Sequence, residues 1–238
     1  MNRIVEVLAD KTDLIKRSQE ILLSRLQAAI EARNQFTIAL AGGSTPKPLY
    51  ESLASQPLPW SKIHFFWGDE RYVPASHNDS NQLMTRQALL DRIDIPQGNI
   101  HPMDTTVADP LEAAQKHEQD LQEFFGVKQT EMPKFDLILL GMGDDGHTAS
   151  LFPKTEALSV SDRLITVGNK DGQPRLTFTV PLINQARCVV FLVAGENKRS
   201  ALKEVFASQG DAQNYPSRLI QPQGELIWLL DRQAAAEL

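Results

Sequence analysis

The chain has 238 residues, of which 42% are hydrophobic and 23% are charged, and its formal net charge is −6 at pH 7. This ordinary globular balance excludes a disordered or low-complexity protein, and the length suits one large α/β domain or two small ones. The acidic balance argues against a general nucleic-acid surface, and the single cysteine, Cys188, excludes a disulfide scaffold and a thiolate metal cluster.

The amino-terminal segment is interrupted by charges at Arg3, Glu6, Asp10 and Lys11. It therefore lacks the apolar core of a secretory signal peptide. The chain also contains no uninterrupted apolar run of about 18 residues, the length that a membrane-spanning helix needs. We expect a cytoplasmic protein that has neither a membrane nor a nucleic acid as its partner.

Short apolar runs that predict buried strands alternate with segments of helical periodicity. Strands are expected at residues 4–8, 37–41, 63–67, 135–140, 164–167, 176–180, 188–193 and 225–230, and helices at 13–32, 46–53, 81–90, 110–125 and 196–207. Near-continuous apolar strands between helices indicate a mostly parallel sheet covered on both faces. We therefore expect one doubly wound, Rossmann-like α/β domain over residues 1–238, with a small antiparallel insert after residue 160.

The first motif with chemical potential is Gly42-Gly43-Ser44-Thr45-Pro46, between an expected strand and an expected helix. Gly42 and Gly43 allow a sharp turn and a close approach of the backbone to a ligand. Ser44 and Thr45 offer hydroxyl donors, and the start of the helix offers free N–H groups. The segment predicts a phosphate cradle, although an ordinary capped turn fits the same residues. Its spacing matches neither a Walker A loop nor the dinucleotide fingerprint.

The second motif is Gly68-Asp69-Glu70-Arg71, directly after the apolar run of residues 63–67. Its charged side chains leave the expected strand at its carboxyl end. The planar guanidinium of Arg71 can bind a carboxylate, a phosphate or a lactone oxygen. Taken alone, a solvated loop with internal ion pairs explains the segment slightly better.

The third and strongest motif runs from Gly141 to Ser150, reads GMGDDGHTAS and follows the expected core strand FDLILL. Three glycines within six residues indicate unusual backbone angles or close approach to a ligand. A histidine exchanges protons near neutral pH, so His147 is a candidate acid or base. Asp145 lies two residues earlier and is placed to orient the imidazole. A capping or core histidine is the structural alternative, which the position after a core strand disfavours.

Two further cations, Arg175 and Lys198, are candidates to complete an anion site, although each alone would be read as a surface charge. The other histidines show no metal-ligand spacing. The sequence Gly-x-Ser-x-Gly of a serine nucleophile is absent, which disfavours a Ser–His–Asp hydrolase. We therefore expect no metal site and no organic cofactor.

Six segments, in this order, resemble the 6-phosphogluconolactonase family. They are LAGGSTPKPLYESLA (residues 40–54), FFWGDERYVP (65–74), HNDSNQLMTRQALL (77–90), FDLILLGMGDDGHTASLFP (135–153), RLTFTVPLINQAR (175–187) and VAGENKRSAL (193–202). The resemblance covers most of the chain. It implies the fold of glucosamine-6-phosphate deaminase and the hydrolysis of 6-phospho-D-glucono-1,5-lactone to 6-phospho-D-gluconate in the oxidative pentose phosphate pathway.

The resemblance also implies roles for individual residues. His147 resembles the general base and Arg71 a catalytic or substrate-orienting residue, and Asp69 and Asp145 resemble members of the active site. The residues that resemble phosphate and sugar contacts are Gly42, Gly43, Ser44, Thr45, Arg175 and Lys198. The expected partner is a small phosphorylated sugar lactone, and the expected state is a monomer or a small homo-oligomer.

Two other functions compete with lactone hydrolysis. A glucosamine-6-phosphate deaminase/isomerase would resemble this sequence but would carry Glu before the proline of the third motif, where Phe152 precedes Pro153. A phenyl ring cannot transfer a proton, so this departure favours the lactonase. A non-catalytic sugar-phosphate sensor would keep the phosphate cradle but would not need His147.

Overall fold

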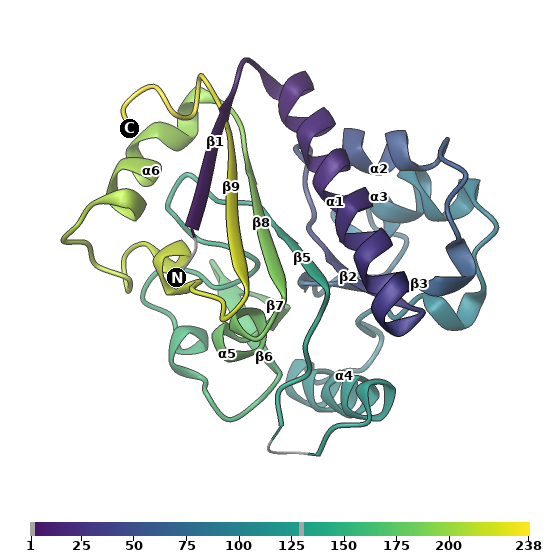
Figure 1. Cartoon of the computed structure of the whole chain (residues 1–238). Coiled ribbons are helices and arrows are strands. Elements are labelled where there is room, and N and C mark those ends of the chain that lie inside the picture. The colour runs from purple at the N-terminus through teal and green to yellow at the C-terminus, as the bar shows by residue number, and fades with distance from the viewer. Residues whose placement is uncertain (1–2, 129–130) are drawn as a thin grey trace.

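The computed structural model describes residues 3–128 and 131–238, which form two sheets (Figure 1). The larger sheet has six parallel strands in the order β1-β9-β8-β5-β2-β3. These strands are β1 (Arg3–Leu8), β2 (Phe36–Leu40), β3 (Ile63–Trp67), β5 (Leu137–Leu140), β8 (Cys188–Val193) and β9 (Glu225–Asp231). The smaller sheet is antiparallel, in the order β4-β7-β6, and consists of β4 (Asp69–Arg71), β6 (Ile165–Lys170) and β7 (Gln173–Phe178).

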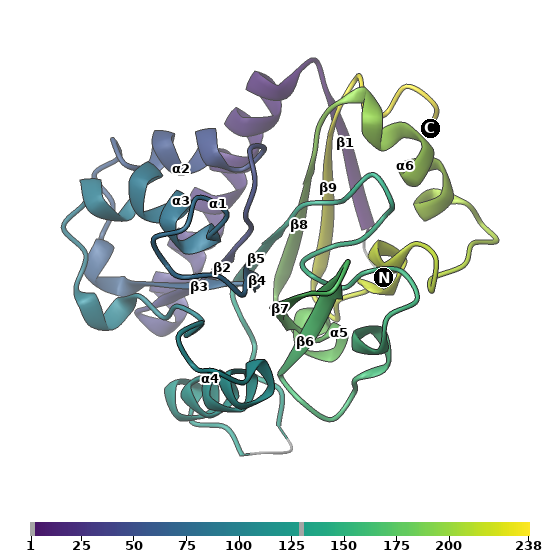
Figure 2. The same cartoon turned by 180° about the vertical axis from the view of Figure 1, so that it is seen from behind.

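The described residues form six α-helices, of which α1–α3 lie on one side of the large sheet and α4–α6 on the other, where α4 packs on the small sheet (Figures 1 and 2). They are α1 (Lys11–Arg33), α2 (Lys47–Leu53), α3 (Asn81–Ala88), α4 (Pro110–Phe125), α5 (Val180–Asn184) and α6 (Arg199–Phe206). Along β2, Ile38 and Leu40 pack in the core shared with α1–α3, and Ala39 packs in the opposite core with α4–α6. This confirms the doubly wound α/β fold. Within the described residues no helix combines the length and the hydropathy needed to cross a bilayer.

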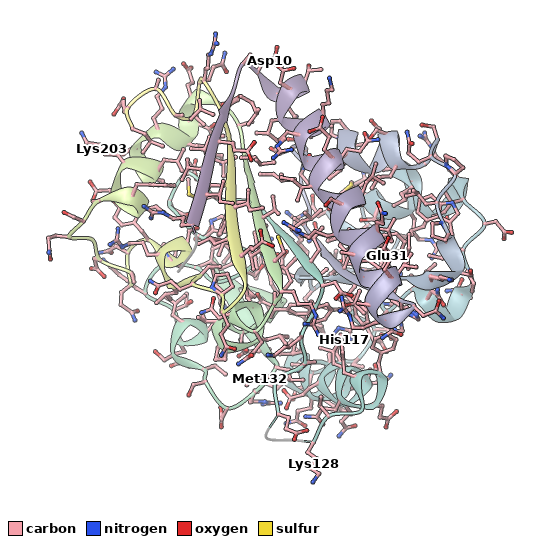
Figure 3. All side chains as sticks on the ribbon, in the orientation of Figure 1. Asp10, Glu31, His117, Lys128, Met132 and Lys203 are labelled. Carbon is pink, nitrogen blue, oxygen red and sulfur yellow. The ribbon has the colours of Figure 1, made fainter. Side chains whose placement is uncertain are left out.

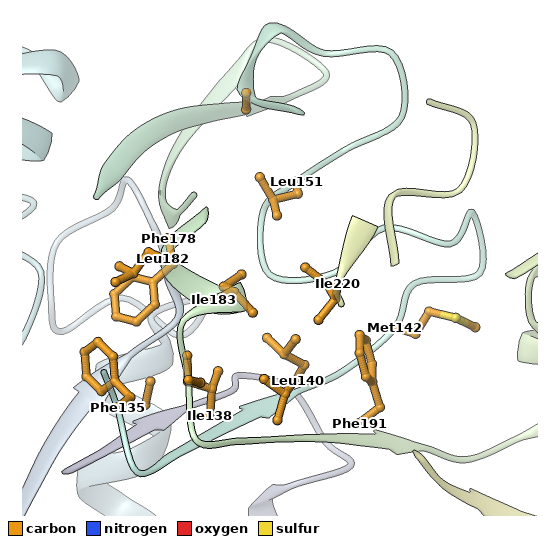
Figure 4. Packing of buried hydrophobic residues seen from close by; sticks show 14 of the residues in the cluster. Phe135, Ile138, Leu140, Met142, Leu151, Phe178, Leu182, Ile183, Phe191 and Ile220 are labelled. Carbon is orange, nitrogen blue, oxygen red and sulfur yellow. The ribbon is translucent and has the colours of Figure 1, made fainter. Parts of the chain in front are cut away.

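The core on the side of α4–α6 also joins the two sheets (Figure 4). Ile138 and Leu140 of β5 and Phe191 of β8 come from the large sheet, and Phe178 ends β7 of the small sheet. All four are at most 1% exposed. Burying side chains of this size contributes roughly 1.5–3 kcal/mol each, so the small sheet is held in place by the same core as the helices.

The antiparallel insert is confirmed, but it includes a strand that the sequence did not predict. Asp69–Arg71 is not a solvated loop, because it forms β4 and pairs with β7. The expected helix over 81–90 ends at Ala88, and the one over 196–207 begins with a 3₁₀ turn, Glu196–Lys198. The β6–β7 turn contains Asp171 and Gly172, both with positive φ (53° and 84°). Such a two-residue loop matches the twist of an antiparallel hairpin.

Three histidines gather between β3, α4 and the segment after residue 99. Nδ1 of His64 lies 3.1 Å from Nε2 of His101, and the ring of His101 stacks on Phe66. His117 of α4 (labelled in Figure 3) is 3% exposed, and neither of its ring nitrogens has a hydrogen-bond partner among the described residues. Burial lowers the pKa of His64, and burial together with a neighbouring imidazole lowers those of His101 and His117 to about 4.

We expect this cluster to make the fold sensitive to acid. Below about pH 6.5 the unfolded chain protonates its histidines while the folded chain keeps His101 and His117 neutral, so the free energy of unfolding falls as the pH drops from about 6.5 towards 4. His117→Leu removes one of these groups and should make the fall less steep. Urea unfolding at pH 7, 5.5 and 4.5 measures it, with the exposed His77→Gln as control. An unchanged pH dependence in His117→Leu would contradict this account.

Candidate active site

A cavity of about 360 Å³ opens at the carboxyl ends of β2, β3, β5 and β8. The chain passes from β2 outward to β3 on one side, and from β5 to β8 on the other. The cavity therefore lies where the direction of winding reverses, which is where doubly wound sheets bind their ligands. The polar or charged side chains that line it are Ser44, Thr45, Asp69, Arg71, Asn81, Asp144, His147, Lys170 and Lys198.

The loop after β5 presents His147 to this cavity. The amide of Gly143 donates to the carbonyl of His147 (2.8 Å), and the amide of Gly146 donates to the carbonyl of Gly143 (3.2 Å), which closes a tight turn. Gly146 has a φ of 78°, which L side chains rarely adopt. A Cβ on Gly143 would lie 2.1 Å from Nδ1 of His147. Gly146 is therefore required by the turn, and Gly143 by the position of the imidazole.

Asp145 fixes the orientation of the His147 ring. Its Oδ1 lies 2.5 Å from Nδ1 of the ring and accepts a hydrogen bond from the amide of His147 at 3.0 Å. Burial acts to raise the pKa of Asp145, but the hydrogen bonds from His147 and its charge outweigh burial and lower the pKa to about 2. The carboxylate is therefore ionised at neutral pH. Because Nδ1 is engaged, Nε2 is the nitrogen left to exchange a proton in the cavity.

Phe152 packs beside the same imidazole. The two ring centroids are 4.6 Å apart. Phe152 is 5% exposed, and the guanidinium of Arg175 and the ammonium of Lys170 lie 5.7 and 5.9 Å from the centroid of its ring. The His147 ring thus has a carboxylate at Nδ1 and an apolar neighbour at its side.

The small sheet turns one polar face toward the His147 loop. Successive residues of a strand point to opposite faces, and residues paired across strands share a face. Arg71 pairs with Arg175, which pairs with Gly168, and Asp69 pairs with Thr177. These residues therefore lie on one face. Leu176 and Phe178, which alternate with Arg175 and Thr177 along β7, are buried in the core on the opposite face.

Ser150 joins this polar face to the His147 loop. Its hydroxyl donates to Oδ2 of Asp69 (2.6 Å), and its amide donates to the hydroxyl of Thr177 (3.2 Å). Its carbonyl oxygen would lie 2.2 Å from a Cβ on Gly168, so only glycine permits this approach. Asp69 is 9% exposed and both lines the cavity and anchors the loop.

The side chain of Glu70 faces the start of α3 and stabilises the fold. Its carboxylate accepts hydrogen bonds from the amides of Arg71, Asn81 and Gln82 and from the hydroxyl of Ser80, at the start of α3. Burial raises its pKa in spite of these donors. The three charges of the second motif therefore have different tasks, since Asp69 and Arg71 line the cavity and Glu70 caps a helix.

Arg71 and Arg175 place two positive charges side by side. They are direct partners across β4 and β7, and the Nε of each is buried without a hydrogen-bond partner in the part of the chain that the structure describes. Nη1 of Arg71 donates to the carbonyl of Asp79. Burial, followed by the charge of Arg71, lowers the pKa of Arg175. Two adjacent guanidiniums with unused donors favour a negatively charged ligand nearby.

The glycine turn after β2 forms the opposite wall of the cavity. Residues 42–45 line it, together with Lys198 from the turn before α6. The hydroxyl of Tyr50 donates to the carbonyl of Ala41 and accepts from its amide, which fixes the end of β2. A Cβ on Gly42 would lie 1.8 Å from Oδ1 of Asn81, so Gly42 is needed for close packing.

The structure brings most of the predicted site residues together. His147, Arg71, Asp69, Lys198 and the glycine turn line the cavity, whereas Asp145 and Arg175 are not among the lining residues and stand behind His147 and Phe152. Sequence reasoning missed the lining residues Asn81, Asp144 and Lys170. For Asp144 a signal existed, because it belongs to the third motif, and the Asp-Gly turn after Lys170 marks a hairpin.

Gly143→Ala should displace the His147 ring, because the added Cβ meets both Nδ1 of His147 and Oδ1 of Asp145. A proton shared between Nδ1 and this carboxylate resonates far downfield in proton NMR, and we expect that resonance in the wild type and not in Gly143→Ala. Gly141→Ala is the matched control, since a Cβ there meets nothing within 4 Å. The account would be wrong if both variants kept the resonance while folding normally by circular dichroism.

Comparison with known proteins identifies one family of relatives. The family model described as glucosamine-6-phosphate isomerases/6-phosphogluconolactonase matches residues 9–228. The 6-phosphogluconolactonase of a Synechocystis species is 64% identical, covering 98% of both chains. The Nostoc protein of the same name is 62% identical, covering 100% of this chain and 99% of its own.

Solved structures agree with these relatives. The 6-phosphogluconolactonase from Trypanosoma cruzi superimposes with a TM-score of 0.88 at 30% identity, covering 100% of this chain and 98% of its own. A monomeric glucosamine-6-phosphate deaminase superimposes with a TM-score of 0.81 over 100% of both chains, but its 17% identity indicates a shared fold only. The chain belongs to the glucosamine-6-phosphate isomerase/6-phosphogluconolactonase family.

Proposed function

We propose that this protein is a 6-phosphogluconolactonase, a carboxylic ester hydrolase of the oxidative pentose phosphate pathway. It converts 6-phospho-D-glucono-1,5-lactone to 6-phospho-D-gluconate within a single cytoplasmic domain. The observation that carries the proposal is the His147 ring, held through Nδ1 by Asp145 and facing a cavity at the switch point of the sheet. The Synechocystis and Nostoc relatives support the choice of substrate.

In this proposal the substrate spans the cavity from the glycine turn to His147. The phosphate binds at Ser44 and Thr45, with Lys198 supplying positive charge. The lactone carbon, C1, then lies near Nε2 of His147. Because the phosphate is bound at the far end of the substrate, its binding energy helps to orient C1 for the reaction.

His147 moves the proton in both halves of the reaction. Neutral His147, donating its Nδ1–H to Asp145, takes a proton on Nε2 from the water whose oxygen attacks C1. The ionised Asp145 stabilises the imidazolium that forms. Arg71, which lines the cavity, orients the lactone and faces the negative charge that grows on the carbonyl oxygen. The bond from C1 to the ring oxygen then breaks, that oxygen takes the proton from His147, and the new carboxylic acid releases its proton to water.

Phe152 argues against the deaminase/isomerase alternative. The deaminase that shares this fold is an amino-sugar phosphate enzyme by name. In this chain the position before Pro153 holds a phenyl ring, packed 4.6 Å from the His147 ring, where a carboxylate would have been needed to assist proton transfer. A lactone needs only a base and an activated water on this side of the site.

His147→Ala should lower kcat by about 10²–10⁴-fold, the usual contribution of a positioned acid or base. Asp145→Asn should also lower kcat, by a smaller factor, because the ring loses its orienting carboxylate. The measurement is the disappearance of fresh lactone at controlled pH, corrected for spontaneous hydrolysis. Wild-type turnover by His147→Ala would refute the catalytic role of His147, and rapid ammonia release from glucosamine 6-phosphate by the wild type would favour the deaminase.

Lys198→Ala should mainly raise KM, by about tenfold, the cost expected when one charged hydrogen bond to the phosphate is lost. Its kcat should stay within about threefold of the wild type, because Lys198 does not act on C1. The same lactone assay over a range of substrate concentrations separates the two constants. A variant with normal KM and strongly reduced kcat would show that the phosphate end and the reacting end have been exchanged.

A further inference from the structure

Lys170 is the last residue of β6 and lines the cavity from the tip of the β6–β7 hairpin. The turn of this hairpin is held in place, because the amide of Gly172 donates to Oδ1 of Asn169 (2.8 Å) and Lys170 pairs with Gln173. The position of the Lys170 backbone at the cavity is therefore set by a regular turn.

The alternation of β6 directs the Lys170 side chain toward the His147 loop. Residues two apart in a strand share a face, so Lys170 lies on the same face as Gly168. Gly168 packs against the carbonyl of Ser150, and Arg175, its partner across the hairpin, lies on this face too. The ammonium of Lys170 accordingly sits 5.9 Å from the centre of the Phe152 ring.

Phe152 in turn connects Lys170 with the reacting end of the site, since its ring is 4.6 Å from that of His147. Across residues 3–128 and 131–238, the Lys170 ammonium has no hydrogen-bonding or ion-pair partner besides the face of this ring. Arg71 differs, because its Nη1 is tied to the carbonyl of Asp79 (2.6 Å). An unpaired ammonium on a flexible side chain, lining the same cavity as the acid–base residue, is suited to meet a charge that appears only during the reaction.

We propose that Lys170 recognises the negative charge at C1, first on the carbonyl oxygen as water attacks and then on the carboxylate of the product. This inference rests on the lactonase function proposed above and adds a second cation to Arg71 at the reacting end. Lys198 and the glycine turn remain the residues that bind the phosphate in this proposal. Charge at C1 is absent from the substrate, so the contact with Lys170 stabilises the transition state more than the bound lactone.

The test compares Lys170→Met with Lys170→Arg, and uses Lys203→Met as the matched control. Lys203 is an exposed lysine that projects from α6 at the edge of the molecule (Figure 3). Lys170→Met should lower kcat for 6-phosphogluconolactone about tenfold with little change in KM, as expected for an interaction made mainly in the transition state. Lys170→Arg should recover most of the rate, and Lys203→Met should match the wild type.

Equilibrium binding separates the two ends of the ligand and does not require turnover. Titration calorimetry should show that Lys170→Met binds 6-phosphogluconate about tenfold more weakly than the wild type, through loss of one charge-assisted contact. Sorbitol 6-phosphate has the phosphate but no carboxylate, and its affinity should not change. Equal weakening for both ligands would place Lys170 at the phosphate, and no weakening for either would remove it from the site, so both results overturn the proposal. A wild type that hydrolyses no lactone would refute the proposed function instead.

Discussion

The geometry of the active site depends on how the small antiparallel sheet docks on the loops of the large one. Ser150 makes this connection through its hydroxyl, which donates to Asp69, and through its amide, which donates to Thr177. Gly168 lets the backbones approach closely enough for both bonds. The opposite face of the small sheet is buried in the core shared with α4–α6. A shift of one residue in its register would exchange the two faces and remove Asp69 and Arg71 from the cavity.

This docking gathers charges that a folded protein would otherwise keep apart. Arg71 and Arg175 lie side by side, each with a buried Nε that has no hydrogen-bond partner within residues 3–128 and 131–238. Such an arrangement lowers the stability of the ligand-free protein and favours an anion in the site. The Asp145–His147 pair has the opposite character, because a carboxylate and an imidazole satisfy each other at 2.5 Å. The site thus combines a carboxylate–imidazole pair whose polar atoms satisfy each other with two arginines whose Nε atoms have no hydrogen-bond partner among the described residues.

Much of this arrangement was predictable from the sequence for a simple reason. Buried parallel strands have continuous apolar sequences. The polar or glycine-rich segments at their carboxyl ends must meet at one edge of the sheet. The runs before Gly42, Gly68 and Gly141 have this form. The glycine turn, the second motif and the His147 loop could therefore be assigned to one site before the fold was known.

The residues that escaped prediction depend on contacts between distant parts of the chain. β4 has three charged residues and becomes a strand only by pairing with β7, about a hundred positions later. Lys170 gains its place through the same small sheet, and Asn81 through its packing on Gly42. Local sequence patterns do not predict such pairings. The alternation of polar and apolar residues in a short strand is informative only when the strand that it pairs with is known.

A structure of the protein with bound 6-phosphogluconate tests the central claim most directly. The account predicts the carboxylate of the ligand within hydrogen-bonding distance of Nε2 of His147, and the phosphate on the turn formed by residues 42–45. The reversed orientation, with the phosphate beside His147 and the carboxylate on the glycine turn, would contradict it.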